Sequence, residues 1–255
     1  KAFWFRDVKF LNAFYMNKGE VVNVNISCSP IQKEGVVARS GQMSAYNVIL
    51  SSRVVPSGRF QIHCTGIIEL EEDLIQHEKA ALQLAPGIPP EFPLSLPNDA
   101  FKKIDMNLFR KLCPHEIAVD KFYGELWKDG LELGRELRLV RKIWIDNPDR
   151  PLMSLGLIEL NPETQQEDLE RWGWMYLPMM DSCLQSGLSG RNWRGAFFPV
   201  EALRARFNKR VSGNSRKVYS ISRKDPHTGR LSMNCCDDDG EYIRSYNIMS
   251  LGQRF

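Results

Sequence analysis

Short runs of apolar residues fill the first seventy positions of the chain and alternate in places with polar ones. Runs of this kind, rich in β-branched and aromatic residues, are typical of β-strands. The segments between them contain Gly, Ser, Asn and Pro at positions suited to turns. We therefore predict strands over residues 8–16, 20–30, 45–55 and 59–70.

A proline-rich segment follows, with six prolines between residues 71 and 114. A connection of this length is uncommon inside a compact domain, so we interpret it as an ordered linker between two units. The predicted organisation is an N-terminal unit over residues 1–75, a linker over residues 76–115 and a C-terminal unit over residues 116–255.

The C-terminal unit mixes helical and strand patterns. Apolar residues in 122–133 recur at helical spacing, and Gly130 is expected to end that helix. Pro178 suits the first turn of a second helix, over residues 178–188. The pattern predicts an α+β fold in which a sheet surrounds one buried helix. Further strands are expected over residues 135–145, 150–160, 197–207, 216–225, 229–240 and 241–255.

The second helix carries an unusual pair of polar residues. Asp181 and Gln185 are four positions apart and so are neighbours on one helix face, within a segment that is mostly apolar. A buried carboxylate is costly unless it is paired or protonated. Two interpretations follow. Asp181 is either a partly exposed residue near the helix N-terminus, where the helix dipole stabilises it, or a carboxyl group held in an apolar site for proton transfer.

Composition and charge narrow the possible functions. The 34 basic and 31 acidic residues are well mixed and give a net charge of +3, so no nucleic-acid partner is expected. No apolar run is long enough to span a membrane. The spacing of the six cysteines matches no zinc site, and no metal is expected. Free cysteines suit a reducing, cytoplasmic location.

Six segments, in order along the chain, resemble the dehydratase domains of polyketide synthases and related multidomain fatty-acid synthases. The resemblance covers almost the whole chain and implies a double hot-dog fold, in which two curved antiparallel sheets each surround a central helix. It also implies dehydration of a 3-hydroxyacyl thioester to an enoyl thioester. The segments are FRDVKFLNAFYMNKGEVVNVNI, RFQIHCTGIIEL, FYGELWKDGLELGRELRLVRKIW, YLPMMDSCLQ, FFPVEALRARF and DDDGEYIRSYNIMSLGQR.

The resemblance also implies roles for particular residues. Because YLPMMDSCLQ is similar to the family's active-site helix, Asp181 is expected to be the catalytic acid and Gln185 to orient it. The family motif Y-G-P-x-F retains only its glycine in this chain, so the width and polarity of the substrate tunnel are expected to differ. The residues expected to contact the substrate are Leu133, Gly134, Pro178 and Leu184.

The catalytic base of the family is a histidine in the motif H-x-x-x-G-x-x-x-x-P, which this sequence does not contain. Either the base belongs to residues outside this chain, which would then begin inside an incomplete first half, or the domain never had it. His63 corresponds to a strand position, and the segment after His77 resembles the motif by coincidence. His115 and His227 are expected to be solvated.

No cofactor is implied, because the substrate would arrive on the phosphopantetheine arm of an acyl carrier protein. The expected partners are that carrier, the neighbouring synthase domains and a second copy in a homodimer. Two other functions stay open. One is a catalytically silent scaffold or docking domain of the synthase; the other is a variant that isomerises a double bond or forms a cyclic ether.

Overall fold

A computed structural model provides the structure of the chain. It describes residues 3–12, 19–31, 45–54, 58–70, 104–165, 167, 176–189, 197–207, 216–227, 230–240 and 242–253.

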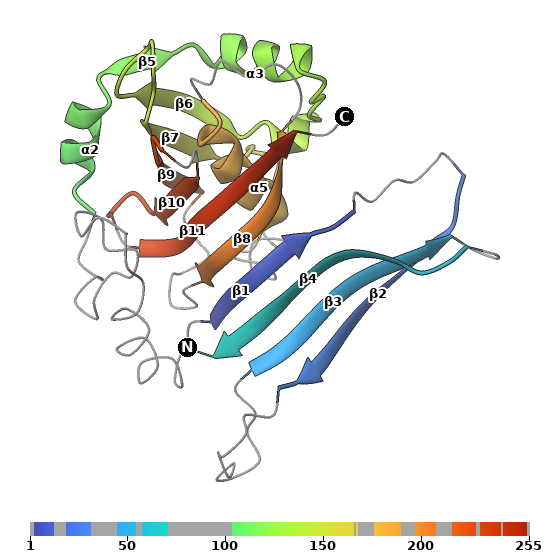
Figure 1. The fold of residues 1–255 in the computed structure, drawn as a ribbon. Helices are drawn as coiled ribbons and strands as arrows, with labels where there is room; N and C mark the ends of the chain where they lie inside the picture. Colours follow the sequence, from blue (N-terminus) through green and yellow to red (C-terminus); the bar gives the residue numbers. More distant parts are fainter. Residues whose placement is uncertain are drawn as a thin grey trace, which may run out of the picture.

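Strands dominate the described residues (Figure 1). The strands are β1 Phe3–Phe10, β2 Val22–Pro30, β3 Ala45–Val54, β4 Gln61–Leu70, β5 His115–Ile117, β6 Val140–Ile145, β7 Met153–Glu159, β8 Phe197–Phe207, β9 Lys217–Lys224, β10 Leu231–Cys236 and β11 Tyr242–Gln253. The helices are α2 Met106–Leu112, α3 Val119–Lys128 and α5 Leu177–Ser186, with a 3₁₀ turn η2 at Arg135–Leu137. These elements confirm the predicted α+β class.

All the described strands belong to one antiparallel sheet with the order β2-β3-β4-β1-β8-β11-β10-β9-β7-β6-β5. Strand β1 joins the two halves, because it pairs with β4 on one side and with β8 on the other. Phe3 lies opposite both Leu70 and Phe207 in these two pairings. In Figure 1 the sheet therefore continues from the N-terminal strands into the strands around α5.

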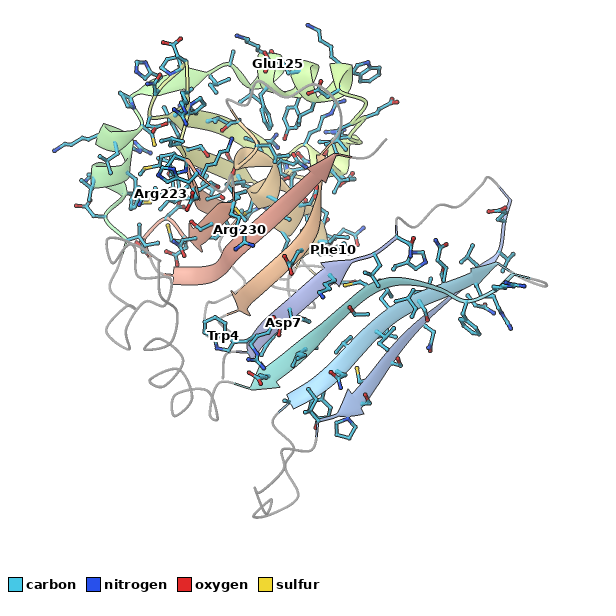
Figure 2. The ribbon with its side chains drawn as sticks, viewed as in Figure 1. Trp4, Asp7, Phe10, Glu125, Arg223 and Arg230 are labelled. Atoms are coloured by element: carbon cyan, nitrogen blue, oxygen red, sulfur yellow. The ribbon has the colours of Figure 1, made fainter. Side chains whose placement is uncertain are left out.

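The described part of the N-terminal half, residues 3–70, contains strands only. Large apolar side chains on these strands are exposed, including Ile26 at 66% and Phe10 at 43%, the latter near the end of β1 in Figure 2. The first strand was predicted over 8–16, but β1 covers Phe3–Phe10, and residues 13–16 of the prediction lie outside the described residues. Its position between β4 and β8 explains the difference, because pairing on both sides fixes the strand at Phe3–Phe10.

Helix α5 packs on strands β6, β7 and β9 of the C-terminal half. Its Met179 and Cys183 are fully buried in a cluster with Ile143 and Ile158. A helix with buried positions on most of its faces belongs in the interior of a sheet that curves around it. The predicted buried helix is therefore confirmed, although it begins one residue earlier than expected, at Leu177.

Helix α3 also follows the sequence prediction. It ends at Lys128, and Gly130 adopts a positive φ of 87°, the conformation that favours glycine after a helix. The segment 135–145 differs from its prediction, because only Val140–Ile145 is a strand. Before it, the Leu137 N–H donates to the Gly134 carbonyl and forms η2 instead.

The described end of the predicted linker, residues 104–115, contains helix α2. Asp105 caps this helix by accepting from the N–H groups of Asn107 and Leu108. The Ile104 N–H also donates to the Gly240 carbonyl, which ties this segment to the turn that follows β10. This part of the segment is therefore attached to the C-terminal half, and the boundary between the two units stays a prediction.

We expect Gly124→Ala to stabilise the protein. Gly124 lies in the exposed middle of α3, and a Cβ there would meet no atom within 4 Å. Alanine in place of glycine in a helix interior is worth about 0.5–1 kcal/mol. Denaturant unfolding of the two proteins should show this gain, and a loss of stability would contradict the environment described for α3.

Candidate functional site

The local structure of α5 places Asp181 beyond the stabilising end of the helix. Tyr176 precedes the helix and Pro178 lies in its first turn, as predicted. Asp181 is the fifth residue of the helix, counted from Leu177. The helix dipole acts mainly within the first turn, so it does little to stabilise a negative charge on Asp181. This geometry does not favour the interpretation of Asp181 as an aspartate stabilised by the helix N-terminus.

Gln185 contacts Asp181 as the spacing predicts. The Gln185 Nε2 donates to Asp181 Oδ2 at 2.6 Å and also to the backbone carbonyl of Leu137 at 2.9 Å. The same carbonyl accepts from Ser182 Oγ at 3.0 Å. Ser182 and Gln185 are almost fully buried, with 0% and 3% exposure, whereas Asp181 is half-buried. A fixed amide therefore holds one oxygen of the carboxyl group and leaves Oδ1 available.

Burial changes the acidity of this carboxyl group. Desolvation raises the pKa of Asp181 above the ordinary aspartate value of 3.8, and the hydrogen bond from Gln185 lowers it to a smaller extent. The net direction is upward, which favours the protonated form. A half-buried carboxyl group with a raised pKa and a fixed orientation is a suitable proton donor.

Two of the residues expected to contact the substrate lie on α5, as Asp181 does, and the other two lie just before η2. Leu184 packs against the main core cluster, and Pro178 is half-buried in the first turn of α5. The Leu133 carbonyl accepts from Arg138 Nε at 2.8 Å. Gly134 is exposed and begins the turn that presents the Leu137 carbonyl to α5. Substrate contact by these residues stays a prediction.

Tyr123 of α3 is a further polar group of this region that sequence reasoning did not single out. Its hydroxyl oxygen accepts from the Val140 N–H at 3.0 Å. Burial raises the pKa of Tyr123 to about 12, and the negative charge of Asp181 contributes in the same direction. The FYGELW segment contained this tyrosine, but helical periodicity alone does not show that its hydroxyl reaches the start of β6.

The described histidines are not placed as partners of Asp181. The His63 ring is buried, with Nε2 at 2.6 Å from Ser52 Oγ and Nδ1 at 3.1 Å from the Asn12 carbonyl. His115 and His227 are exposed, as expected. His77 lies outside the described residues.

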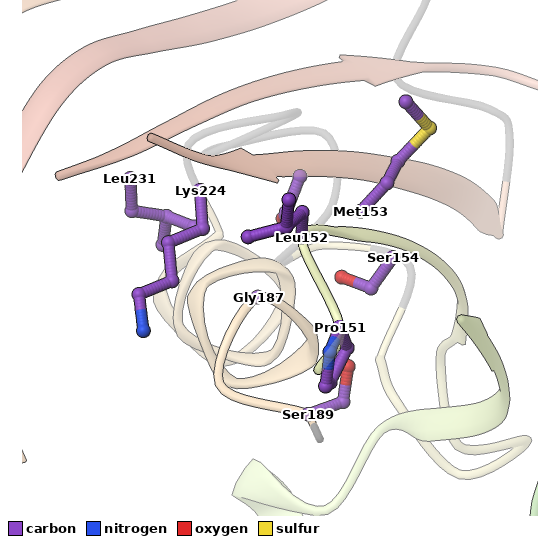
Figure 3. Close-up of a pocket in the computed structure, with 9 residues that line it drawn as sticks. Pro151, Leu152, Met153, Ser154, Gly187, Ser189, Lys224 and Leu231 are labelled. Carbon is purple, nitrogen blue, oxygen red and sulfur yellow. The ribbon is translucent and has the colours of Figure 1, made fainter. Parts of the chain in front are cut away.

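A small pocket, with room for about one water molecule, lies at the other end of α5 (Figure 3). Its lining includes Gly187 and Ser189 after the helix and Ser154 and Ser222 from the sheet, but not Asp181. The Ser222 hydroxyl is buried and has no hydrogen-bond partner among the described residues. This pocket has a mixed polar and apolar lining and does not include Asp181, so the expected tunnel to that residue stays a prediction.

Within the described residues, no group of His, Cys, Asp and Glu side chains is arranged to hold a metal ion. No described helix is long and apolar enough to cross a membrane. All six cysteines are free thiols. Cys183 is buried on α5, whereas Cys28 is exposed on β2.

The raised pKa of Asp181 predicts a pH-dependent cost to folding. An acid with a higher pKa in the folded state binds more protons when folded, so its contribution to stability is complete below the unfolded pKa, near 3.8, and is lost as pH rises through the folded pKa. Asp181→Asn removes this titration. We therefore expect the variant to gain stability relative to the wild type as pH rises from 4 to neutrality.

Unfolding free energies of both proteins, measured at several pH values in denaturant, test this expectation. The difference between the two proteins isolates Asp181 from the other titrating groups, because these are common to both. A difference that does not change with pH would show that Asp181 has an ordinary pKa in the folded protein.

Known proteins resemble this chain in sequence and in fold. Residues 110–251, more than half of the chain, match the family model described as "Polyketide synthase dehydratase N-terminal domain". No curated protein matches the sequence. The fold matches solved dehydratase domains from three modules of the curacin polyketide synthase.

For the CurF module the TM-score is 0.73 at 14% identity, covering 99% of this chain and 76% of that one. For the CurK module the TM-score is 0.70 at 15% identity, covering 99% of this chain and 74% of that one. For the CurJ module the TM-score is 0.70 at 15% identity, covering 99% of this chain and 75% of that one. These similarities confirm the double hot-dog fold, and the family match shows that the chain belongs to the dehydratase domains of polyketide synthases.

Proposed function

We propose that this domain dehydrates a 3-hydroxyacyl thioester carried on an acyl carrier protein, with Asp181 as the acid. The observation that supports this most directly is the half-buried Asp181 carboxyl group, whose pKa is raised and whose Oδ2 is held by Gln185. A mutant of the CurK dehydratase in which asparagine replaces an aspartate is described as inactive. An acidic side chain is therefore required in at least one dehydratase of the same fold.

The proposed reaction moves two protons. A base removes the proton from the carbon beside the thioester carbonyl, and the carbon–oxygen bond at the 3-position breaks. Asp181 transfers its proton to the departing hydroxyl oxygen, which leaves as water, and becomes a carboxylate. The Gln185 Nε2 donates to this carboxylate and stabilises it. Proton return from the base to Asp181 completes the cycle.

The base is proposed to be a histidine, as in the family. A CurK mutant with phenylalanine in place of a histidine is described as inactive. Residues 1–255 do not contain the motif H-x-x-x-G-x-x-x-x-P, and the His63 ring is held by Ser52 and Asn12. No histidine of residues 1–255 is therefore assigned as the base.

Mass spectrometry tests the proposal. A 3-hydroxyacyl thioester, either on its carrier protein or as a pantetheine analogue, is incubated with the full-length protein. Dehydration lowers the mass of the acyl group by one water. A mass change of this kind with the wild type and not with Asp181→Asn is the expected result. Isomerisation of a double bond and closure of a cyclic ether both leave the mass unchanged, so unchanged mass with altered chromatographic mobility would favour those reactions.

The competing function is a silent docking domain of the synthase. It is favoured by the segment from Leu133 to Leu137, which retains only the glycine of the family motif Y-G-P-x-F. A silent domain would bind the carrier protein without changing the acyl group. Binding measured by titration calorimetry, together with no turnover of any 3-hydroxyacyl thioester tested, would support this function and overturn the proposed one.

A further inference from the structure

The backbone carbonyl of Leu137 connects η2 to the polar face of α5. It accepts two side-chain hydrogen bonds, from Ser182 Oγ at 3.0 Å and from Gln185 Nε2 at 2.9 Å. Both side chains are almost fully buried, so water cannot replace these bonds easily. Since Leu137 precedes Arg138, whose guanidinium donates to Leu133, the whole turn is held in one position.

This carbonyl determines which way the Gln185 amide points. One Nε2 hydrogen is donated to the Leu137 carbonyl and the other to Asp181 Oδ2 at 2.6 Å. In the reversed orientation Oε1 would face two acceptors, the Leu137 carbonyl oxygen and the Asp181 carboxyl oxygen. The carbonyl would repel it, and the carboxyl oxygen would repel it too unless the carboxyl proton lay between that oxygen and Oε1. In the observed orientation Oε1 is buried and has no hydrogen-bond partner among the described residues, so the two donated bonds hold the amide against that cost.

We propose that Ser182 is a positioning residue of this site: it holds the Leu137 carbonyl on α5 so that the Gln185 amide presents only its Nε2 hydrogens to Asp181. Because the carbonyl-type oxygen of a carboxyl group is the better acceptor, the hydrogen bond from Gln185 to Oδ2 favours the acid proton of Asp181 on Oδ1. The Ser182 hydroxyl donates to the Leu137 carbonyl and not to the Asp181 carboxyl group, so it acts through the carbonyl and the amide.

Among the described residues, Tyr123 of α3 is a titratable group that interacts electrostatically with Asp181, and the guanidinium groups of Arg138 and Arg141 act on the same tyrosine. Tyr123 has a pKa of about 12 and stays neutral at ordinary pH. If replacing Ser182 changes the titration of Asp181, the change can therefore be attributed to the Leu137 carbonyl and the Gln185 amide. The importance of this arrangement for turnover rests on the proposed function, whereas its effect on the Asp181 carboxyl group does not.

Infrared difference spectroscopy tests the proposal without turnover. The band of the protonated Asp181 carboxyl group is followed against pH, with Asp181→Asn as the reference that lacks it. Ser182→Ala should move the titration midpoint upward, because a loosely held amide stabilises the carboxylate less well. Gln185→Leu should move it upward as well, and adding Ser182→Ala to Gln185→Leu should cause no further shift.

A matched control is Ser220→Ala. Ser220 is fully buried and its hydroxyl donates to the Cys183 carbonyl of α5 at 3.1 Å, so the variant also removes a buried bond between a serine and a carbonyl of this region. It should lower thermal stability to a similar extent as Ser182→Ala and leave the Asp181 titration unchanged. An unchanged midpoint in Ser182→Ala, or an equal shift in the presence and absence of Gln185, would overturn the proposal.

Turnover adds a second readout. If the domain is a dehydratase, Ser182→Ala should lower kcat about tenfold with KM nearly unchanged, because misplacement of a proton donor affects the chemical step and not binding. A protein without dehydratase activity would overturn the proposed function, and the infrared titration would still decide the role of Ser182.

Discussion

Replacing Asp181 with Asn is expected to lower the turnover of a 3-hydroxyacyl thioester by about 100- to 10,000-fold, the range for loss of a general acid. Asparagine has nearly the same shape and its side-chain oxygen can still accept from Gln185 Nε2, so the contact at 2.6 Å can be kept. It has no acidic proton to give to the departing hydroxyl oxygen. The measurement is single-turnover kinetics with mass detection, which separates the chemical step from product release.

Asp105→Asn is the matched control for this experiment. Asp105 is exposed and caps α2, and asparagine is an equally good capping residue. The control should keep its turnover within about twofold, as expected for a surface substitution that preserves a cap. Turnover of Asp181→Asn at the wild-type rate would remove Asp181 from the mechanism.

The fold could be predicted from the sequence where local pattern and packing agree. Most strands after β1, helix α3 with its end at Gly130, and the buried helix around Asp181 follow from periodicity and turn residues. The short strand β5 was not predicted, and β6 begins later than its predicted segment. The register of β1 could not be predicted in this way, because it depends on pairing with β4 and β8, which are about 60 and 200 residues away along the chain.

The site was predictable only in part for the same reason. The spacing of Asp181 and Gln185 on one helix was sufficient to predict their hydrogen bond. The Leu137 carbonyl could not be anticipated, because its segment has the composition of a strand and forms a 3₁₀ turn in the structure. Side-chain patterns contain no information about which backbone oxygen a buried amide will meet, so the sequence does not single out Ser182.

Gly156→Ala is expected to destabilise the protein by about 1–3 kcal/mol, the usual cost of overpacking a well-packed core. Gly156 lies on β7 where α5 crosses the strand, and a Cβ there would lie 2.5 Å from Ser186 Cβ and 2.8 Å from Ser186 Oγ. The helix would have to move away from the sheet. Because Asp181 is on the same helix, turnover should also fall in the fraction that remains folded.

A second substitution separates this clash from a general loss of stability. Ser186→Gly removes the atoms that the new Cβ meets, so the double variant Gly156→Ala/Ser186→Gly should be more stable than the sum of its two single variants allows. Gly124→Ala is the control, since the same change at an open helix position should stabilise. Strict additivity of the two substitutions in denaturant unfolding would show that α5 does not lie against β7 at Gly156, and the placement of Asp181 would then be wrong as well.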